Sequence, residues 1–253
     1  ATPVVLAGVR ISLLEAHPWL AILVTLFWIV AITNAFNLLD NMDGLATGVA
    51  LVCSPLLWFI TTALGEVYIG FFLSALIGAL AGFLLHNFPP ARIFLGDAGS
   101  LTIGYLIGVI TVLASSVAPG EKVRNEWFGS FMPVLVLGLP LYDMASVIWI
   151  RWREGRPIYR GDRSHLSHRL LELGMTEREA VGTIYVLAFC LGASALFLRN
   201  ATPMLTLLAL GQVGAIVAVT TILMHVPRRT RLVELRLSSK GESDAGSTRQ
   251  SKL

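Results

Sequence analysis

The chain has 253 residues, of which 55% are hydrophobic and only 14% are charged, and its net charge is +3. A soluble domain has about a quarter of its residues charged, and so small a net charge does not indicate a nucleic-acid partner. The two cysteines, Cys53 and Cys190, lie inside apolar stretches, which argues against a disulfide framework. The composition therefore indicates a membrane protein.

Seven long apolar runs predict seven membrane-spanning helices, because each has about the 20 residues that cross about 30 Å of hydrocarbon. In chain order they cover residues 19–39, 44–65, 67–86, 98–120, 127–150, 180–198 and 200–226. Residues 1–14 resemble the end of another apolar segment. We expect an all-α, polytopic helix bundle over 1–226, then a basic surface stretch and a disordered tail over 227–253.

The basic residues predict which ends of the helices face the cytoplasm. Fifteen of the nineteen Lys and Arg belong to the loops near residues 40, 90 and 151–178 or to the C-terminal tail. Short loops rich in Lys and Arg stay cytoplasmic. Asp143 is expected about eight residues inside its span, where an ionisable group needs a polar cavity or a partner.

The first polar segment, NAFNLLDNMDGLATG over 34–48, separates two apolar runs. On a helix Asn37 and Asp40 share a face, and Gly44 suggests that the helix breaks there. One interpretation is a polar helix end with capping residues. The other is a site for a hard cation such as Mg²⁺, which prefers oxygen ligands.

The second polar segment, HNFPPARIFLGDAGSLTIG over 86–104, places Asp97 between glycines just before an apolar helix. Asp97 could simply cap this helix, or it could hold a cation that also touches a phosphate at the helix N-terminus. Phe94 is either an aromatic at the membrane interface or a stacking surface for a flat base, and the residues alone favour the interface.

The third polar segment, RWREGRPIYRGDRSHLSHRLLELGMT over 151–176, is rich in arginine. His165 and His168 are three residues apart and share one side of a helix. Arg163 and Arg169 beside them disfavour a zinc pair and favour phosphate. The alternative is a basic loop with incidental histidines.

Together these segments resemble the polyprenyl-phosphate N-acetylhexosamine-1-phosphate transferase family. NAFNLLDNMDGLATG is similar to its Asn-rich Asp motif, FPPARIFLGDAGS to its Gly-Asp-x-Gly-Ser loop and GDRSHLSHRL to its His-x-x-His loop. The resemblance covers roughly residues 15–200. It implies transfer of a sugar-1-phosphate from a UDP-N-acetylhexosamine to a polyprenyl phosphate, with release of UMP, as the first step of a bacterial cell-envelope glycan at the inner membrane.

The resemblance also implies roles for individual residues. A Mg²⁺ ion, or Mn²⁺ in its place, would be held by Asp97 with Asn37 as a second ligand. Phe94 would stack on uracil, which reverses the preference stated above. The other implied positions are Asp40 and the phosphate-binding His165 and His168 as catalytic residues, and Asn37, Asp43, Asn87 and Arg163 as substrate-binding residues.

Two departures from the family pattern matter. Asn41 stands where the family has glycine, and the family's adjacent Asp-Asp pair on an earlier loop occurs nowhere in the chain. We therefore expect an N-terminally incomplete form of a transferase of 10–11 helices, with low or no activity as residues 1–253 alone.

Three alternative functions stay open at this point. HLSH lacks the three consecutive histidines of the phospho-MurNAc-pentapeptide transferase branch, which is placed second. A transporter that uses the acids as an ion path would need charges spread through the membrane depth. A catalytically inactive homologue or fragment is the third alternative. The oligomeric state, including a homodimer, is not decided by these residues.

Overall fold

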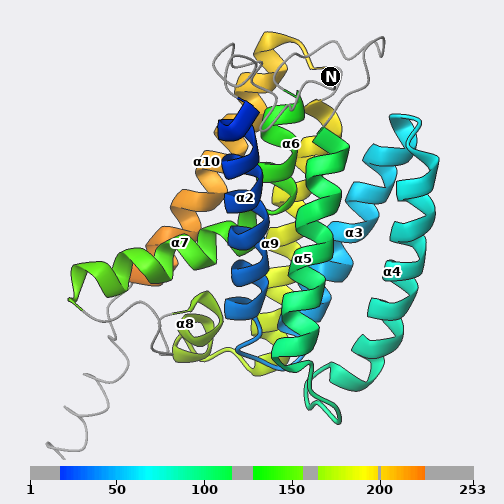
Figure 1. Cartoon of the computed structure of the whole chain (residues 1–253). Coiled ribbons are helices and arrows are strands. Elements are labelled where there is room, and N and C mark those ends of the chain that lie inside the picture. The colour runs from blue at the N-terminus through cyan, green and yellow to red at the C-terminus, as the bar shows by residue number, and fades with distance from the viewer. Residues whose placement is uncertain (1–17, 116–127, 156–164, 199–200, 226–253) are drawn as a thin grey trace, which may run out of the picture.

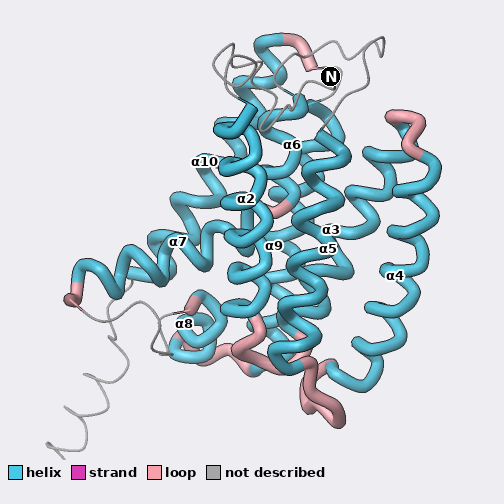
Figure 2. The backbone as a smooth tube through the Cα atoms, in the orientation of Figure 1, coloured by secondary structure: helices cyan, strands magenta, loops and turns pink. Residues whose placement is uncertain are grey.

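The computed structural model describes residues 18–115, 128–155, 165–198 and 201–225, and within them it contains helices and short connections but no strand (Figures 1 and 2). Six helices are long and apolar enough to cross a membrane, namely α2, α3, α4, α5, α9 and α10. The predicted all-α membrane bundle is therefore confirmed. The helices are α2 (Pro18–Leu39), α3 (Leu45–Ala63), α4 (Val67–Asn87), α5 (Gly96–Ser115), α6 (Phe128–Val136), α7 (Gly138–Arg153), α8 (Leu166–Glu172), α9 (Glu177–Leu198) and α10 (Pro203–His225).

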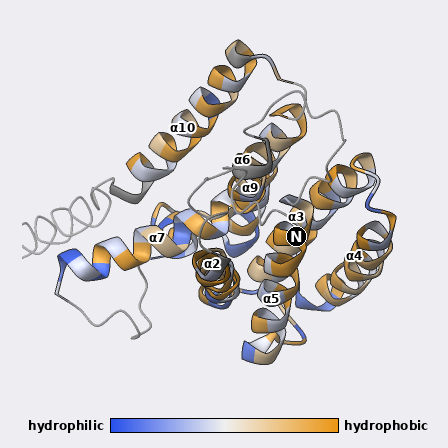
Figure 3. Ribbon diagram, turned by 45° about the horizontal axis from the view of Figure 1, so that its top comes forward, coloured by the Kyte–Doolittle hydropathy of each residue, from blue (hydrophilic) through white to orange (hydrophobic). Residues whose placement is uncertain are grey.

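Hydrophobic residues run along the membrane-length helices (Figure 3), and many large ones are exposed on the outside of the bundle. Phe27 on α2 is 73% exposed, Tyr68 on α4 is 89% exposed and Leu85 on α4 is 82% exposed. Water would make such surfaces unfavourable, whereas lipid tails solvate them. The core lies around α3, where Val49, Cys53 and Leu57 are fully buried.

Helices α2 and α5 pack with their backbones in close contact. A Cβ on Gly104 of α5 would lie 2.7 Å from the Cα of Thr33 on α2, so only glycine permits this distance. Trp28 on α2 donates from Nε1 to the Thr111 hydroxyl on α5 at 3.0 Å. This packing brings the last turn of α2 beside the first turn of α5.

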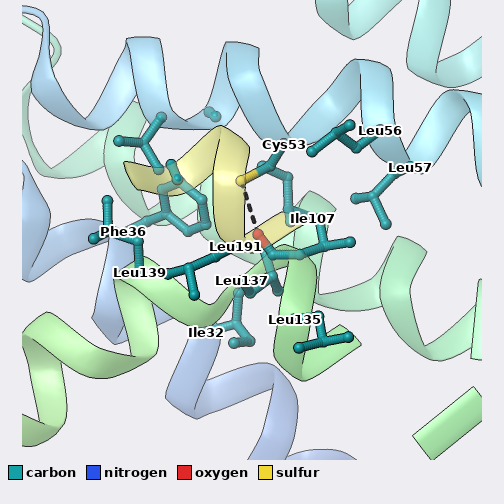
Figure 4. Close-up of a cluster of buried hydrophobic side chains, with 14 of the residues drawn as sticks. Ile32, Phe36, Cys53, Leu56, Leu57, Ile107, Leu135, Leu137, Leu139 and Leu191 are labelled. Carbon is teal, nitrogen blue, oxygen red and sulfur yellow. Dashed lines mark hydrogen bonds between the residues drawn. The ribbon is translucent and has the colours of Figure 1, made fainter. Parts of the chain in front are cut away.

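The predicted span over 127–150 is wrong as a single helix, because it divides into α6 and α7. Pro140 has no N–H to donate to the Val136 carbonyl four residues earlier, so the helical hydrogen bond is lost there. The thiol of Cys53 on α3 donates to that carbonyl instead, with an Sγ to O distance of 3.2 Å (Figure 4). The break at Leu137 is therefore stabilised by a neighbouring helix.

The break turns α7 away from the bundle axis, so that α7 runs sideways toward the end of the bundle where α8 lies (Figure 1). Asp143 consequently contacts the start of α8. The predicted straight span around Asp143 is wrong, whereas the predicted need for a partner is confirmed.

The connections after α2 and α4, together with α8, lie at one end of the bundle (Figure 2). The connection between α3 and α4 lies at the opposite end (Figure 2). We call the first of these ends of the bundle the polar edge, and it comprises residues 37–44, residues 87–100, Asp143 and residues 165–172. All three polar segments of the sequence contribute to it, as their separation by pairs of helices predicts.

Candidate functional site

The first contact at the polar edge joins α2 to α5. Asn37, in the last turn of α2, donates from Nδ2 to Asp97 Oδ1 at 3.0 Å and to the Ser100 hydroxyl at 3.0 Å. Asp97 itself lies exposed in the first turn of α5. The two residues are 60 positions apart in the sequence, and the close packing of α2 and α5 brings them together.

Asp40 follows the end of α2 and is close enough to the carboxylates of Asp97 and Asp43 to be affected by their charges. Its pKa is raised from 3.8 to about 6, first by burial and then by the negative charges of Asp97 and Asp43. A hydrogen bond from the Gly96 backbone N–H acts in the opposite direction. Burial and the two neighbouring negative charges together disfavour the ionised form of Asp40.

Asp43 contacts the second polar segment directly. Its Oδ2 accepts a hydrogen bond from the Ala91 backbone N–H at 2.9 Å. Gly44, next in the chain, has a φ of 73°, which places the turn in a conformation that glycine adopts without strain. The left-handed turn and the Asp43 bond together set the position of the 88–95 loop.

Asn87 and Phe94, both predicted to bind substrate, lie in different environments. The Asn87 side chain is 3% exposed; it accepts from Thr47 Oγ1 at 3.0 Å and donates to the Ile93 carbonyl at 2.9 Å. Its amide therefore supports the loop from inside the protein. Phe94 is 77% exposed. An exposed ring on a braced loop suits stacking on a planar group.

The third polar segment contributes His165 to a buried pair of ionisable side chains. His165 is 4% exposed, and its Nδ1 lies 2.8 Å from Oδ2 of Asp143 on α7. The other carboxylate oxygen, Oδ1, accepts from the Leu166 backbone N–H at 3.0 Å. One carboxylate thus holds both the imidazole and the first N–H of α8.

Further hydrogen bonds tie α8 and α9 to the first two polar segments. Ser167 on α8 donates to Oδ1 of Asn41 at 2.6 Å, and Arg178 Nε donates to the Pro89 carbonyl at 2.9 Å. Tyr185 on α9 donates to the Gly44 carbonyl at 2.6 Å. The segment over 37–44 therefore touches both other parts of the polar edge.

Most predicted site residues lie within this described polar edge. Arg163 is outside the described residues, and His168 lies half-buried on α8. Sequence reasoning missed the structural role of Asn41 and the pairing of Asp143 with His165. For Asn41 the signal was its departure from the family's glycine, and for Asp143 its acidic side chain in an apolar run.

Within the described residues no group of three or more His, Cys, Asp or Glu side chains is placed to hold a metal ion by itself. The local chemistry nevertheless fits a hard cation that substrate and water help to ligate. Mg²⁺ is usually bound by one or two carboxylates together with substrate phosphates and water. The carboxylates of Asp40, Asp43 and Asp97 are the negatively charged groups that such a cation would meet.

Fold and polar edge together define a class: a membrane helix bundle with acids and histidines gathered at one edge. Residues 4–115 match the model of glycosyl transferase family 4. The chain is 37% identical over 189 residues to the "Probable undecaprenyl-phosphate N-acetylglucosaminyl 1-phosphate transferase" of Bacillus subtilis, which covers 75% of this chain and 51% of that protein. The chain belongs to glycosyl transferase family 4.

Two further relatives extend the comparison. The decaprenyl-phosphate N-acetylglucosaminephosphotransferase of Mycolicibacterium smegmatis is 35% identical over 232 residues, which is 83% of this chain and 54% of that protein. The phospho-N-acetylmuramoyl-pentapeptide-transferase of Desulforudis audaxviator is 31% identical over 177 residues, which is 68% of this chain and 48% of that protein. The chain thus spans about half the length of the curated relatives it matches.

Proposed function

We propose that the chain forms the nucleotide-sugar side of an enzyme that transfers N-acetylhexosamine-1-phosphate from a UDP-sugar to a polyprenyl phosphate at the cytoplasmic face of a bacterial membrane. In this reaction an oxygen of the lipid phosphate forms a bond to the phosphorus that carries the sugar. The bond from that phosphorus to the bridging oxygen breaks, and UMP leaves with the bridging oxygen.

The observation that carries the proposal is the contact of residues 37–44 with both other polar segments. Asn37 bonds to Asp97, Asp43 to Ala91, and Asn41 to Ser167. A soluble anionic substrate and a lipid phosphate can meet only at a membrane boundary. Phosphoryl transfer depends mainly on positioning and on neutralising charge, and this edge holds groups for both.

Within this proposal Asp97 holds a divalent cation, Mg²⁺ or Mn²⁺, and Asp40 organises the same site. The cation would neutralise charge on the diphosphate. Asn37 acts here through Asp97, because its amide nitrogen rather than its oxygen faces that carboxylate. Such an amide holds the carboxylate in one orientation, as second-shell partners of metal ligands commonly do.

Phe94 offers its exposed ring to uracil, and Asp43 contributes to nucleotide binding while it braces the loop. His165 and His168 contact phosphate, and Arg163 adds positive charge beside them. We propose that Asn87 acts on the substrate through the loop, because its side-chain oxygen and its side-chain nitrogen both form hydrogen bonds within the protein. For the sugar we favour N-acetylglucosamine, which the names of the first two relatives contain.

The test is UMP release from a panel of UDP-sugars with a polyprenyl phosphate, with and without Mg²⁺. It is run on the 253-residue chain and on the product of the whole open reading frame that encodes it. We expect release that depends on Mg²⁺ and is greatest with UDP-N-acetylglucosamine in the second preparation, and little or none in the first. Absence of release from both, with every sugar, would contradict the proposal.

A further inference from the structure

Asp143 is the most completely buried acid among the described residues of the polar edge, with 3% of its surface exposed. A carboxylate in such a place requires hydrogen-bond partners. Asp143 has one for each oxygen: His165 Nδ1 at 2.8 Å from Oδ2 and the Leu166 backbone N–H at 3.0 Å from Oδ1. Two consecutive residues of the third polar segment therefore depend on one side chain from α7.

The contact restricts what His165 can do. An ionised carboxylate only accepts hydrogen bonds, so the proton shared between Asp143 and His165 belongs on Nδ1. In the neutral ring Nε2 then carries no proton and is the nitrogen left for other contacts. A partner on one ring nitrogen commonly sets the tautomer and the orientation of a functional histidine in this way.

A purely structural role for Asp143 does not account for all of its contacts with His165 and Leu166. The start of α8 has a second anchor, the 2.6 Å hydrogen bond from Ser167 to Asn41 on the first polar segment. A buried ion pair is by itself weak evidence for stability, because apolar residues of similar volume often serve as well. What the carboxylate adds beyond an anchor is a defined orientation and tautomer of the His165 ring.

We propose that Asp143 is the positioning residue of His165, holding the imidazole with its proton on Nδ1 so that Nε2 meets a phosphate oxygen of the substrates. The inference rests on the proposed function, in which His165 contacts phosphate. Nε2 accepts a proton from a protonated phosphate oxygen when the ring is neutral. The carboxylate of Asp143 then balances the charge of the imidazolium that forms.

The decisive variant is Asp143→Asn, which keeps the size of the side chain. Its amide can still accept from Leu166 N, but it presents an N–H group to His165 Nδ1 and so moves the ring proton to Nε2. Asp143→Glu keeps the carboxylate, and Ser167→Ala is the matched control that weakens the other anchor of α8. All are made in the product of the whole open reading frame.

Three measurements separate the explanations: ¹⁵N NMR shifts of labelled histidines with the ring neutral, kcat and KM for UMP release, and the melting temperature. His165→Gln assigns the resonances. We expect a proton on Nδ1 in the wild type and in Ser167→Ala, and on Nε2 in Asp143→Asn. We expect kcat of Asp143→Asn to fall about 10- to 100-fold with KM unchanged, and Asp143→Glu to recover part of it.

A neutral wild-type ring protonated on Nε2 would overturn the proposal, and so would an Asp143→Asn variant with unchanged kcat. Equal losses of kcat in Asp143→Asn and Ser167→Ala, in step with the melting temperature, would show a structural role only and would also overturn it. A wild type that releases no UMP contradicts the proposed function instead, and the NMR result distinguishes that case.

Discussion

The polar edge contains two acidic regions whose carboxylates have opposite surroundings. Asp143 is buried, and both of its oxygens are bonded to His165 and Leu166. Asp40 is partly exposed, and the nearby charges of Asp97 and Asp43 repel it. A balanced carboxylate holds another residue in place, whereas a repelled one attracts a cation. The difference separates the positioning region that we propose from the proposed cation-binding region.

Among the substitutions that test this difference between the two acidic regions, Asp97→Asn should have the largest effect. The substitution preserves the shape of the side chain and removes its charge at the exposed start of α5. Because the negative charge that would hold the cation is lost, we expect UMP release to fall by about 1000-fold or more. The melting temperature without divalent cations should change little. Activity within about tenfold of wild type would contradict the assignment of Asp97 as a cation ligand.

The next largest effect concerns the packing of α2 against α5, which assembles the proposed cation-binding region. Gly104→Ala would place a Cβ 2.7 Å from the Cα of Thr33 and 3.0 Å from its carbonyl oxygen. Backbone cannot move aside cheaply, so α2 and α5 must separate, at a cost of about 1–3 kcal/mol in unfolding free energy.

For Gly104→Ala we expect a lower unfolding free energy, measured with denaturant in detergent, and a weaker affinity for Mg²⁺. Gly82→Ala on α4 is the matched control, since a Cβ there would meet no atom within 4 Å. If both variants lose the same stability, close contact between α2 and α5 is not what Gly104 provides.

The pH dependence of stability and of Mg²⁺ affinity tests the contrast between Asp40 and Asp143 further. The pKa of Asp40 in the folded protein, about 6, is above the ordinary value of 3.8. Between pH 3.8 and about 6 the folded state therefore binds more protons than the unfolded state. Without divalent cations, the stability of the protein should fall as the pH rises through about 6. Mg²⁺ competes with this proton, so its affinity should weaken as the pH falls below about 6.

Thermal melting and Mg²⁺ titration across this range test the prediction. Asp40→Asn removes the titrating group, so both pH dependences should flatten in that variant. A wild type whose Mg²⁺ affinity is independent of pH would show that Asp40 does not face the cation.

The smallest effect concerns the break that directs α7, and with it Asp143, toward the polar edge. Cys53→Ala removes the donor to the Val136 carbonyl, which should cost about 1 kcal/mol of unfolding free energy. Cys53→Ser keeps a donor and should lose less. The comparison is made by denaturant unfolding, and a serine variant less stable than the alanine variant would count against the hydrogen bond.

Contacts at the site could be predicted from the sequence only where both partners carried a signal. Asn37 and Asp97 each lie in a recognisable polar segment, and the structure joins them. Asn41 could not be linked to Ser167, 126 residues away, because no periodicity encodes a contact between different helices. The aromatic Phe94 was noticed, but its 77% exposure follows from the 88–95 loop conformation.

The sequence by itself determined the membrane helices and the end of the bundle at which the polar segments gather. Hydrophobic run length and the absence of backbone partners in lipid leave few alternatives. Only the tertiary structure decided that residues 127–150 break into α6 and α7, since Pro133 and Pro140 also lie in a continuous apolar run. A carbonyl released by proline needs a donor from elsewhere, and which neighbour supplies it depends on packing.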